Sequence, residues 1–366
     1  MNRIALLYNR LYDFDNCNLT LGGIQTYVIN LISICKEMNI DVEFFQMGDS
    51  NKNTVFNGIV INQINTHNYQ VFSNKVKELT IDNEPAIVYC TETIVPQRVP
   101  FKKAMAIQHG IYWDIPYFHH KSLIRVLASK LIQNYHILSP LSGLKQIVCV
   151  DYNYINWFRA TCNDQNIKLI PIPNYTRIAP IYTKESNRIN IIFARRLFEY
   201  RGTRIFTTAI KRILDEYSNV NVTVAGTGPD EGYMKQELSK YKNVEFITYK
   251  SEESLHIHAN KHIAVVPTVG SEGTSLSLLE AMSAQCAVIA SNVGGMTNII
   301  LDNYNGLLVN AGDSDDLYKA IKKLLDYPKD RERLSAKAYE TVKQAFSYEK
   351  WAEKWKEVLS TFIEIE

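Results

Sequence analysis

Short apolar runs alternate along this chain with stretches in which apolar residues recur every three or four positions. The first pattern is typical of buried β-strands, and the second of helices with one buried face. In the first half, strands are predicted at residues 3–8, 42–45, 86–89, 104–107, 146–150 and 168–170. In the second half, they are predicted at residues 189–194, 220–225, 244–247, 263–266 and 287–290. Strands separated by helices in this way predict an α/β fold with parallel sheets.

Helical spacing is clearest just after the first strand and near the end of the chain. A helix is predicted from Ile24 to Cys35, and amphipathic helices at residues 315–326 and 329–345. Ser347 is a suitable N-cap for a last helix. One side of that helix carries Trp351, Trp355 and Leu359.

The length of the chain favours more than one core. It has 366 residues, which suits two domains. The polar stretch from Thr176 to Arg188 lacks a strand pattern and is the candidate linker. We therefore expect domains at residues 1–175 and 176–345, followed by a terminal helix at 346–366.

Charge and cysteine content narrow the class of protein. The net charge of +2 argues against a nucleic-acid partner, because no basic excess is present to neutralise phosphates. The six cysteines are scattered without a CxxC pair, which is typical of a reduced, cytoplasmic protein. The apolar run at the N-terminus is too short for a signal peptide, and no run reaches the length of a membrane span. A soluble or peripheral cytoplasmic protein is expected.

The stretch from Ile263 to Gly312 contains the most informative pattern. A buried strand leads into a loop with Glu272, and a helix follows with Glu280 in its second turn. This order places a helix N-terminus at the edge of a sheet, where free N–H groups suit a phosphate or diphosphate. Two carboxylates beside it suit a ligand that joins phosphate to sugar, although either glutamate alone is more often a solvated charge. The backbone positions expected to bind are Gly273, Thr274, Ser275 and Leu276.

Residues 272–295, EGTSLSLLEAMSAQCAVIASNVGG, resemble the nucleotide-sugar site of the retaining glycosyltransferases of family 4, whose fold is called GT-B. The resemblance implies two Rossmann-like, doubly wound domains facing across a cleft, with the terminal helix crossing back to the first domain. It also implies that Glu272 faces the donor sugar and that Glu280 holds the nucleotide ribose. The sequence departs from the family pattern at Gln285, Ala287 and Asn298.

Residues 194–202, ARRLFEYRG, resemble the Gly-Arg-Leu and Lys-Gly pair with which the family brings two cations to the donor diphosphate. Arg195 stands in the place of the Gly and Arg201 in the place of the Lys. Arginine binds phosphate oxygens through two N–H groups, so the cationic chemistry is kept. The match favours Arg196 and Arg201 over Arg195; the alternative is a solvent-exposed turn.

A glycine turn with Gly226 and Gly228 follows the strand at 220–225. It lacks the third glycine of a dinucleotide fingerprint, which disfavours a nicotinamide dehydrogenase. In the resembled family this turn lines the nucleotide pocket. The backbone after the next strand contacts the base there, which implies a similar place for Tyr249.

Gly22 and Gly23 precede the first helix, where the resemblance implies a loop near the donor diphosphate and the acceptor. His109 follows the strand at 104–107, at the edge where open α/β sheets bind ligands. It resembles the family's histidine that faces the donor sugar and the reaction centre. A glycine pair that serves only packing and a structural histidine are the alternatives.

Residues 115–145 are basic, and no acidic residue lies between Asp114 and Asp151. The segment carries Lys121, Arg125, Lys130 and Lys145 among apolar residues. It predicts either an amphipathic helix resting on the anionic inner leaflet of a membrane or an ordinary helix docked on its own sheet.

Two Asp-x-Asp patterns, at Asp13–Asp15 and Asp313–Asp315, bear on metal binding. Such a pattern binds metal in a different glycosyltransferase fold, but neither pair here follows the required strand. We expect no metal site and no cofactor, the nucleoside-diphosphate sugar being a substrate.

The resemblance implies a retaining hexosyltransferase that moves sugar from a nucleoside-diphosphate sugar to a hydroxyl of a glycan or lipid-linked saccharide. Such enzymes serve polysaccharide biosynthesis, including lipopolysaccharide and capsule. His109, Arg196, Arg201 and Glu272 are the expected catalytic residues. Two alternatives stay open: a sugar-nucleotide epimerase or hydrolase on the same fold, and a scaffold that binds nucleotide sugar without catalysis.

Overall fold

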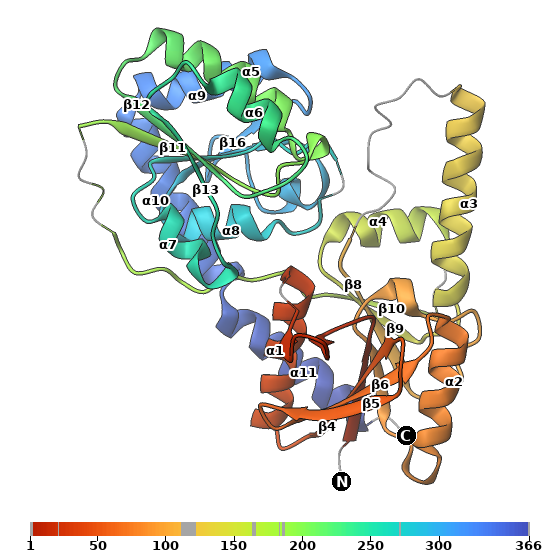
Figure 1. The fold of residues 1–366 in the computed structure, drawn as a ribbon. Coiled ribbons are helices and arrows are strands. Elements are labelled where there is room, and N and C mark those ends of the chain that lie inside the picture. Colours follow the sequence, from red (N-terminus) through yellow and green to blue (C-terminus); the bar gives the residue numbers. More distant parts are fainter. Residues whose placement is uncertain are drawn as a thin grey trace. The chain divides into compact units, whose positions relative to one another are not determined.

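The computed structural model describes residues 3–20, 22–110, 122–162, 166–182, 184, 187–270 and 272–364. Figure 1 shows the ribbon. The described residues form two compact units. Unit 1 takes in those of Met1–His109, His120–Ile172 and Trp351–Glu366, and unit 2 those of Gly110–His119 and Pro173–Lys350.

Unit 1 is built on an eight-stranded sheet in which neighbouring strands are parallel except at one edge. Its inner strands are runs of buried apolar residues, as expected for a parallel sheet covered on both faces. The six strands predicted for this half are confirmed. In spatial order the sheet contains β10 (Lys168–Pro171), β9 (Gln146–Cys149), β8 (Ala104–Gln108), β7 (Ala86–Tyr89), β1 (Arg3–Tyr8), β4 (Asp41–Gly48), β6 (Ile59–Asn65) and β5 (Lys52–Phe56).

The edge strand β5 and its neighbour β6 were not predicted. They form an antiparallel hairpin in which Phe56 pairs with Ile59. The two residues between them, Asn57 and Gly58, have φ angles of 50° and 69°. Positive φ at both positions matches the twist of a two-residue hairpin turn, for which Asn-Gly is the preferred sequence.

The helices of unit 1 surround this sheet, and the terminal helix is among them. As predicted, it buries Trp351, Trp355 and Leu359. The indole N–H of Trp355 donates to the hydroxyl of Tyr27 on α1 at 2.8 Å, which joins the two ends of the chain within this unit. The helices and 3₁₀ turns are α1 (Gly23–Glu37), α2 (Tyr69–Leu79), η1 (Ile81–Asn83), η2 (Glu92–Ile94), α3 (Leu123–Leu141), α4 (Tyr152–Thr161) and, from Trp351 onward, α11 (Tyr348–Glu364).

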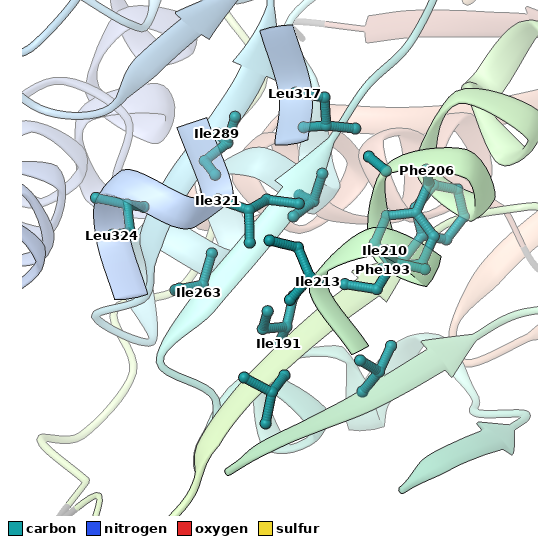
Figure 2. Close-up of a cluster of buried hydrophobic side chains, with 14 of the residues drawn as sticks. Ile191, Phe193, Phe206, Ile210, Ile213, Ile263, Ile289, Leu317, Ile321 and Leu324 are labelled. Carbon is teal, nitrogen blue, oxygen red and sulfur yellow. The ribbon is translucent and has the colours of Figure 1, made fainter. Parts of the chain in front are cut away.

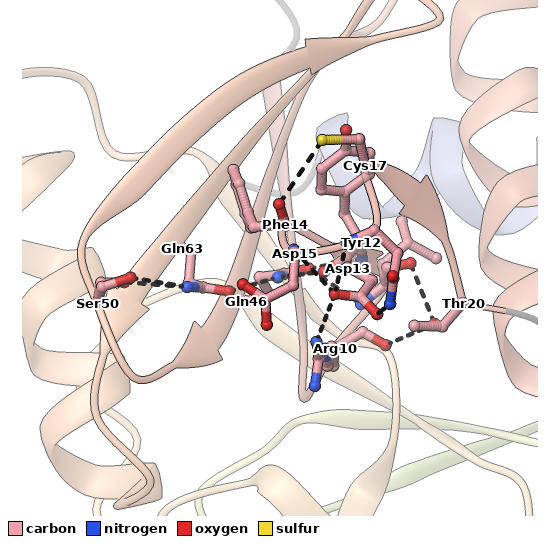
Figure 3. A network of polar contacts seen from close by, with 12 residues as sticks. Arg10, Tyr12, Asp13, Phe14, Asp15, Cys17, Thr20, Gln46, Ser50 and Gln63 are labelled. Carbon is pink, nitrogen blue, oxygen red and sulfur yellow. Dashed lines mark hydrogen bonds and ion pairs between the residues drawn. The ribbon is translucent and has the colours of Figure 1, made fainter.

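A polar network lies at the carboxyl ends of β1 and β4 (Figure 3). The buried Gln46 accepts a hydrogen bond from the N–H of Tyr12 at 2.8 Å and donates to the carbonyl of the same residue. It also donates to Oε1 of Gln63 at 2.9 Å. Gln46 therefore satisfies backbone groups of the short hairpin formed by β2 (Tyr12–Asp13) and β3 (Asn18–Leu19).

Unit 2 contains a six-stranded sheet in which all neighbouring strands are parallel. The predicted strands are confirmed, and β16 is added at one edge. In spatial order they are β13 (Val244–Ile247), β12 (Val220–Ala225), β11 (Ile189–Ala194), β14 (Ile263–Val266), β15 (Ala287–Ser291) and β16 (Leu307–Val309).

Helices cover both faces of this sheet because successive side chains of a strand point to opposite sides. On one face, Ile191, Ile263 and Ile289 pack against α5 and α9 (Figure 2). On the other, Ile192 and Val288 pack against α8 and α10. This is the predicted doubly wound α/β architecture. The helices and 3₁₀ turns are η4 (Glu199–Arg201), α5 (Thr203–Glu216), α6 (Glu231–Leu238), η5 (Ser251–Glu253), α7 (Ser254–His258), α8 (Leu276–Ser283), η6 (Gly294–Asn298), α9 (Ser314–Asp326) and α10 (Pro328–Ala345).

Candidate functional site

The candidate residues of unit 2 gather at the carboxyl edge of its sheet. β11 lies between β12 and β14, so the chain leaves this central strand in one direction and later returns to its other side. Such a switch point opens a crevice at the carboxyl ends of the strands, where α/β sheets bind ligands. The loops after β11 and β14 bring Arg195, Arg201 and Glu272 together there.

Glu272 is the centre of this cluster. Its side chain is buried, and Oε2 accepts hydrogen bonds from Arg195 at 2.5 Å, from Arg201 and from the hydroxyl of Thr268 at 3.3 Å. Burial alone raises the pKa of Glu272, but the charges of Arg195 and Arg201 outweigh burial and lower it. The carboxylate is therefore ionised and engaged by two cations.

The three arginines after β11 have different surroundings. Arg195 is buried and also donates to the hydroxyl of Thr268 at 2.5 Å. Arg201 is partly exposed and lies over the ring of Tyr200. Arg196 is exposed, with its guanidinium over the ring of Phe198 and no bond to Glu272. The residue that the sequence match ranked last is thus the most deeply buried of the three and bonds directly to the glutamate.

Glu280 lies on α8 and is half-buried. Desolvation raises its pKa to about 7, and a hydrogen bond with the Ser254 side chain opposes the shift. Burial together with the charge of Glu280 raises the pKa of Tyr249 to about 12, while Arg195 opposes that rise. Tyr249 therefore shares an electrostatic environment with both groups. Ser254 and Thr268 were not predicted, because isolated hydroxyl residues carry no sequence signal.

The predicted backbone positions lie at the start of α8. Thr274 and Ser275 are buried, and the Ser275 side chain makes no capping hydrogen bond. The carbonyl of Thr274 accepts from the side-chain amide of Asn174 at 2.8 Å, which fixes the loop before the helix. An uncapped helix start offers N–H groups and a positive dipole end to an anion. Gly273 and Leu276 flank this segment.

Gly226 and Gly228 pack against the loop that carries the arginines. A Cβ at Gly226 would lie 2.1 Å from the carbonyl oxygen of Arg195, and one at Gly228 would lie 2.4 Å from that of Leu197. Both have positive φ, at 136° and 159°. These glycines are required for the close approach of two loops, which holds Arg195 in place.

A second glycine pair supports Glu272 itself. The N–H of Gly295 donates to the Glu272 carbonyl at 2.8 Å. A Cβ at Gly294 would lie 2.0 Å from the same oxygen, and its φ is 52°. The turn after β15 therefore works as a backbone support for the glutamate loop.

In unit 1, His109 follows β8 and is half-buried, in edge contact with the ring of Tyr27 at 4.9 Å. Desolvation lowers its pKa to about 4, although a hydrogen bond to the Cys90 backbone opposes this. Its Nε2 has no hydrogen-bond partner among the described residues. The imidazole is therefore neutral near pH 7, with Nε2 able to accept a hydrogen bond.

Two buried acids near His109 were missed by the sequence reasoning. Glu92 accepts from the N–H of His109 at 3.3 Å and from the Thr91 hydroxyl at 3.2 Å. Burial raises the pKa of Glu92 to about 7 and that of Asp151, which caps α4, to about 6. They follow β7 and β9, the two neighbours of β8. A polar residue directly after a buried strand was the available signal.

Gly22 and Gly23 lie at the start of α1, where Gly22 is the N-cap with extended backbone. A cavity of about 500 Å³ in the same unit lies at the carboxyl ends of β1 and β4. Charged groups of both signs line it, among them Arg10, Asp49 and Lys52. Residues 111–121, which include Lys121 of the predicted basic segment, lie outside the described residues.

The two Asp-x-Asp patterns have local structural partners. Asp13 accepts from the N–H groups of Asp15 and Asn16, and Asp313 caps α9 by accepting from Asp315 and Asp316. Within the described ranges, no three His, Cys, Asp or Glu side chains are placed to share a metal ion.

Comparison with known proteins agrees with this geometry. Residues 174–341, which lie within unit 2, match the family described as glycosyl transferases group 1. These residues therefore resemble a group 1 glycosyltransferase domain. The chain is similar to an uncharacterised glycosyltransferase of Methanocaldococcus jannaschii, with 24% identity over 341 residues that cover 90% of this chain and 92% of that protein.

Two further comparisons extend this result. The phosphatidyl-myo-inositol mannosyltransferase of Mycobacterium leprae is 26% identical over 156 residues, which are 42% of each chain. The crystal structure of HepE from Anabaena in complex with UDP superposes with a TM-score of 0.71 at 16% identity, covering 99% of this chain and 100% of that one. The two Rossmann-like units thus form a GT-B fold, as predicted.

In unit 2, we expect Gly294→Ala to lower the free energy of unfolding by about 3 kcal/mol, because the new Cβ meets the Glu272 carbonyl at a positive φ. Urea denaturation measures this. Gly312→Ala is the matched control: its φ is 83°, but a Cβ there meets nothing within 4 Å. Equal losses in the two variants would contradict the support role of Gly294.

The buried acids of unit 1 predict a pH-dependent stability. The folded pKa of Glu92, about 7, lies above its ordinary value of 4.5, so the folded state holds the proton more tightly. Stability therefore falls as pH rises through this window. Glu92→Gln should raise the free energy of unfolding near pH 9 by roughly 1–3 kcal/mol and change it little near pH 4.

Denaturation at both pH values measures this effect. Glu78→Gln, at an exposed position of α2, is the control and should have no effect at either pH. A Glu92→Gln variant with an unchanged pH profile would show that Glu92 is not desolvated.

Proposed function

We propose that this protein is a retaining glycosyltransferase that moves a hexose-type sugar from a nucleoside-diphosphate sugar to a hydroxyl of a glycan or lipid-linked saccharide. The observation that carries the proposal is the cluster of Arg195, Glu272 and Arg201 at the carboxyl edge of the group 1 domain. A partly exposed arginine such as Arg201, beside an uncapped helix start, suits a diphosphate.

The leaving diphosphate gains negative charge as the bond to the sugar breaks. We expect Arg196, Arg201 and the start of α8 to stabilise that charge, because cations and N–H groups held beside a leaving group favour the charge that develops on it. Glu280 accepts hydrogen bonds from the ribose hydroxyls, and Glu272 from hydroxyls of the sugar. His109 offers a neutral acceptor for a further hydroxyl, and no residue is assigned as a covalent nucleophile.

The donor and the setting are part of the proposal. HepE was solved with UDP, which makes a uridine nucleotide the first donor to test. We propose a reaction that needs neither metal nor cofactor, no nucleic-acid partner, and a cytoplasmic place in polysaccharide or glycoconjugate synthesis, such as that of lipopolysaccharide or capsule.

Donor binding provides the test. A panel of UDP-, GDP-, dTDP- and ADP-sugars, with and without magnesium, should contain one member that raises the melting temperature. Glu280→Gln should lower the affinity for that donor roughly 10- to 100-fold, because hydrogen bonds to a carboxylate are replaced by weaker ones. Wild-type affinity should fall as pH drops below about 7, where Glu280 takes up a proton, and the variant should lose this dependence.

Glu332→Gln, at an exposed position of α10, is the control and should leave affinity and its pH dependence unchanged. A folded protein that binds no member of the panel would refute the donor site. Binding without sugar transfer or donor cleavage would favour the scaffold, and isomerised donor would favour an epimerase.

The acceptor side of the proposal depends on α3. Its buried residues are confined to Pro140 and Leu141 at the end of the helix. At 3.6 residues per turn, Ile124, Leu127 and Leu131 share one face, and they are 79%, 55% and 71% exposed. A monomer rarely leaves such an apolar face open unless it binds a surface. No helix of the described ranges is long and apolar enough to cross a membrane.

We propose that α3 rests on an anionic membrane surface. Arg125 and Lys130 lie on this helix, and the segment between Asp114 and Asp151 has no acidic residue, so its charge is complementary to anionic headgroups. One relative is named for transfer to phosphatidyl-myo-inositol, a lipid acceptor. The same face thus suits an enzyme whose acceptor is anchored in lipid.

The double variant Leu127→Ser/Leu131→Ser should weaken binding to vesicles of phosphatidylcholine with phosphatidylglycerol by roughly tenfold or more, because two leucines lose their burial. Co-sedimentation measures this. Leu79→Ser/Ile81→Ser changes two side chains of unit 1 that are each 68% exposed and should leave binding intact. If the wild-type protein does not bind vesicles but self-associates in light scattering, α3 pairs with a second copy of the chain instead.

A further inference from the structure

Without a donor, the carboxylate of Glu272 is already occupied by hydrogen bonds from neighbouring side chains of unit 2. Oε2 of Glu272 receives three hydrogen bonds, from Arg195, Arg201 and Thr268. Ser275 also forms a side-chain hydrogen bond with this carboxylate. A carboxylate engaged in this way has little capacity left for sugar hydroxyls. One of its partners must leave before it binds a sugar.

The two arginines differ in burial and in their place on the chain. Arg195 is buried and bonds to both Glu272 and Thr268, while Thr268 itself bonds to Glu272, so the three groups form a closed triangle. The Arg201 side chain is 16% exposed, compared with 6% for Arg195, and it extends from the short turn η4. Arg201 is therefore the partner that an incoming anion reaches first.

We infer that Arg195 is a positioning residue: it holds Glu272 ionised and in place when Arg201 leaves it for the donor diphosphate. This rests on the proposed function. A buried carboxylate that lost both cations would take up a proton. With Arg195 in place, the carboxylate stays charged and its freed lone pairs accept hydroxyls of the sugar.

Such an exchange makes the site selective for a nucleoside-diphosphate sugar over a free sugar. A nucleoside-diphosphate sugar supplies an anion for Arg201 and hydroxyls for Glu272 at the same time. A free sugar supplies no anion and would leave a cation without its partner. The sugar part of the donor therefore adds affinity only when the diphosphate is present and Arg195 keeps the carboxylate charged.

The test compares two ligands by calorimetry: UDP and UDP-glucose, or the corresponding pair that wild type binds in the donor panel. The affinity for UDP-glucose divided by that for UDP is the gain in affinity due to the sugar, called the sugar gain below. In Arg195→Met, affinity for the nucleoside diphosphate should stay within about threefold, whereas the gain due to the sugar should fall by roughly 10- to 100-fold. In Arg201→Met, both ligands should bind more weakly.

The pH profile separates positioning from a structural effect. Removing Arg195 removes one of the charges that lower the pKa of Glu272, so that pKa must rise. The pH below which the sugar gain disappears should therefore be higher in Arg195→Met than in wild type. Arg195→Lys keeps the charge and should restore the wild-type limit in large part. Arg212→Met, on the outer side of α5 and paired with Asp315, is the matched control and should change nothing.

Each outcome decides a separate claim. Wild type that binds no nucleotide sugar refutes the proposed function. Wild type that binds, with an Arg195→Met variant that keeps the sugar gain and its pH limit, refutes the role of Arg195 alone. If Arg195→Met does not fold, the pH limit of Arg195→Lys decides. A limit slightly above that of wild type supports the role of Arg195, and a limit identical to that of wild type refutes it.

Discussion

The ion pairs of one buried carboxylate determine how the candidate site of unit 2 is built. Desolvation pushes Glu272 toward its neutral form, and two guanidinium groups reverse that tendency. Such an arrangement is stable only if the cations are held in position, because a buried charge without a partner is costly. The backbone provides this: the N–H of Val269, after β14, donates to the carbonyl of Tyr200 at 2.9 Å and joins the Glu272 loop to the Arg201 turn. Charge and loop geometry therefore depend on each other.

The parallel sheet makes this arrangement possible. Neighbouring parallel strands end at the same edge, so the loops after β11, β12, β14 and β15 meet there without long connections. They meet so closely that side chains are excluded at Gly226 and Gly294. The glycines of the motif therefore have a packing reason that is independent of any ligand.

The sequence predicts most strands because a strand buried on both faces is a continuous apolar run, as Ala86–Tyr89 is. The hairpin β5–β6 lies at a half-exposed edge of the sheet, and its Asn57-Gly58 turn is the sequence signal that indicates it. In the site, the spacing of Glu272 and Glu280 is visible along the chain. The ion pair between Arg195 and Glu272 is not visible in the sequence, because the direction of the side chains after β11 depends on loops that are distant in sequence. Glu92 and Asp151 were not predicted for a similar reason, since only the strand order places β7 and β9 on either side of β8.

The electrostatic character of the two units differs in a way that fits the two substrates of a transfer reaction. Unit 2 concentrates cations around one ionised carboxylate, which suits a dianionic diphosphate. At the end of β8, unit 1 holds an uncharged imidazole beside Glu92, an acid whose pKa of about 7 leaves much of it protonated at neutral pH. Groups that are neutral in their resting state bind a hydroxyl without the desolvation cost of a charge. Under the proposed function, a diphosphate is therefore better matched to unit 2, whereas an uncharged hydroxyl is better matched to unit 1.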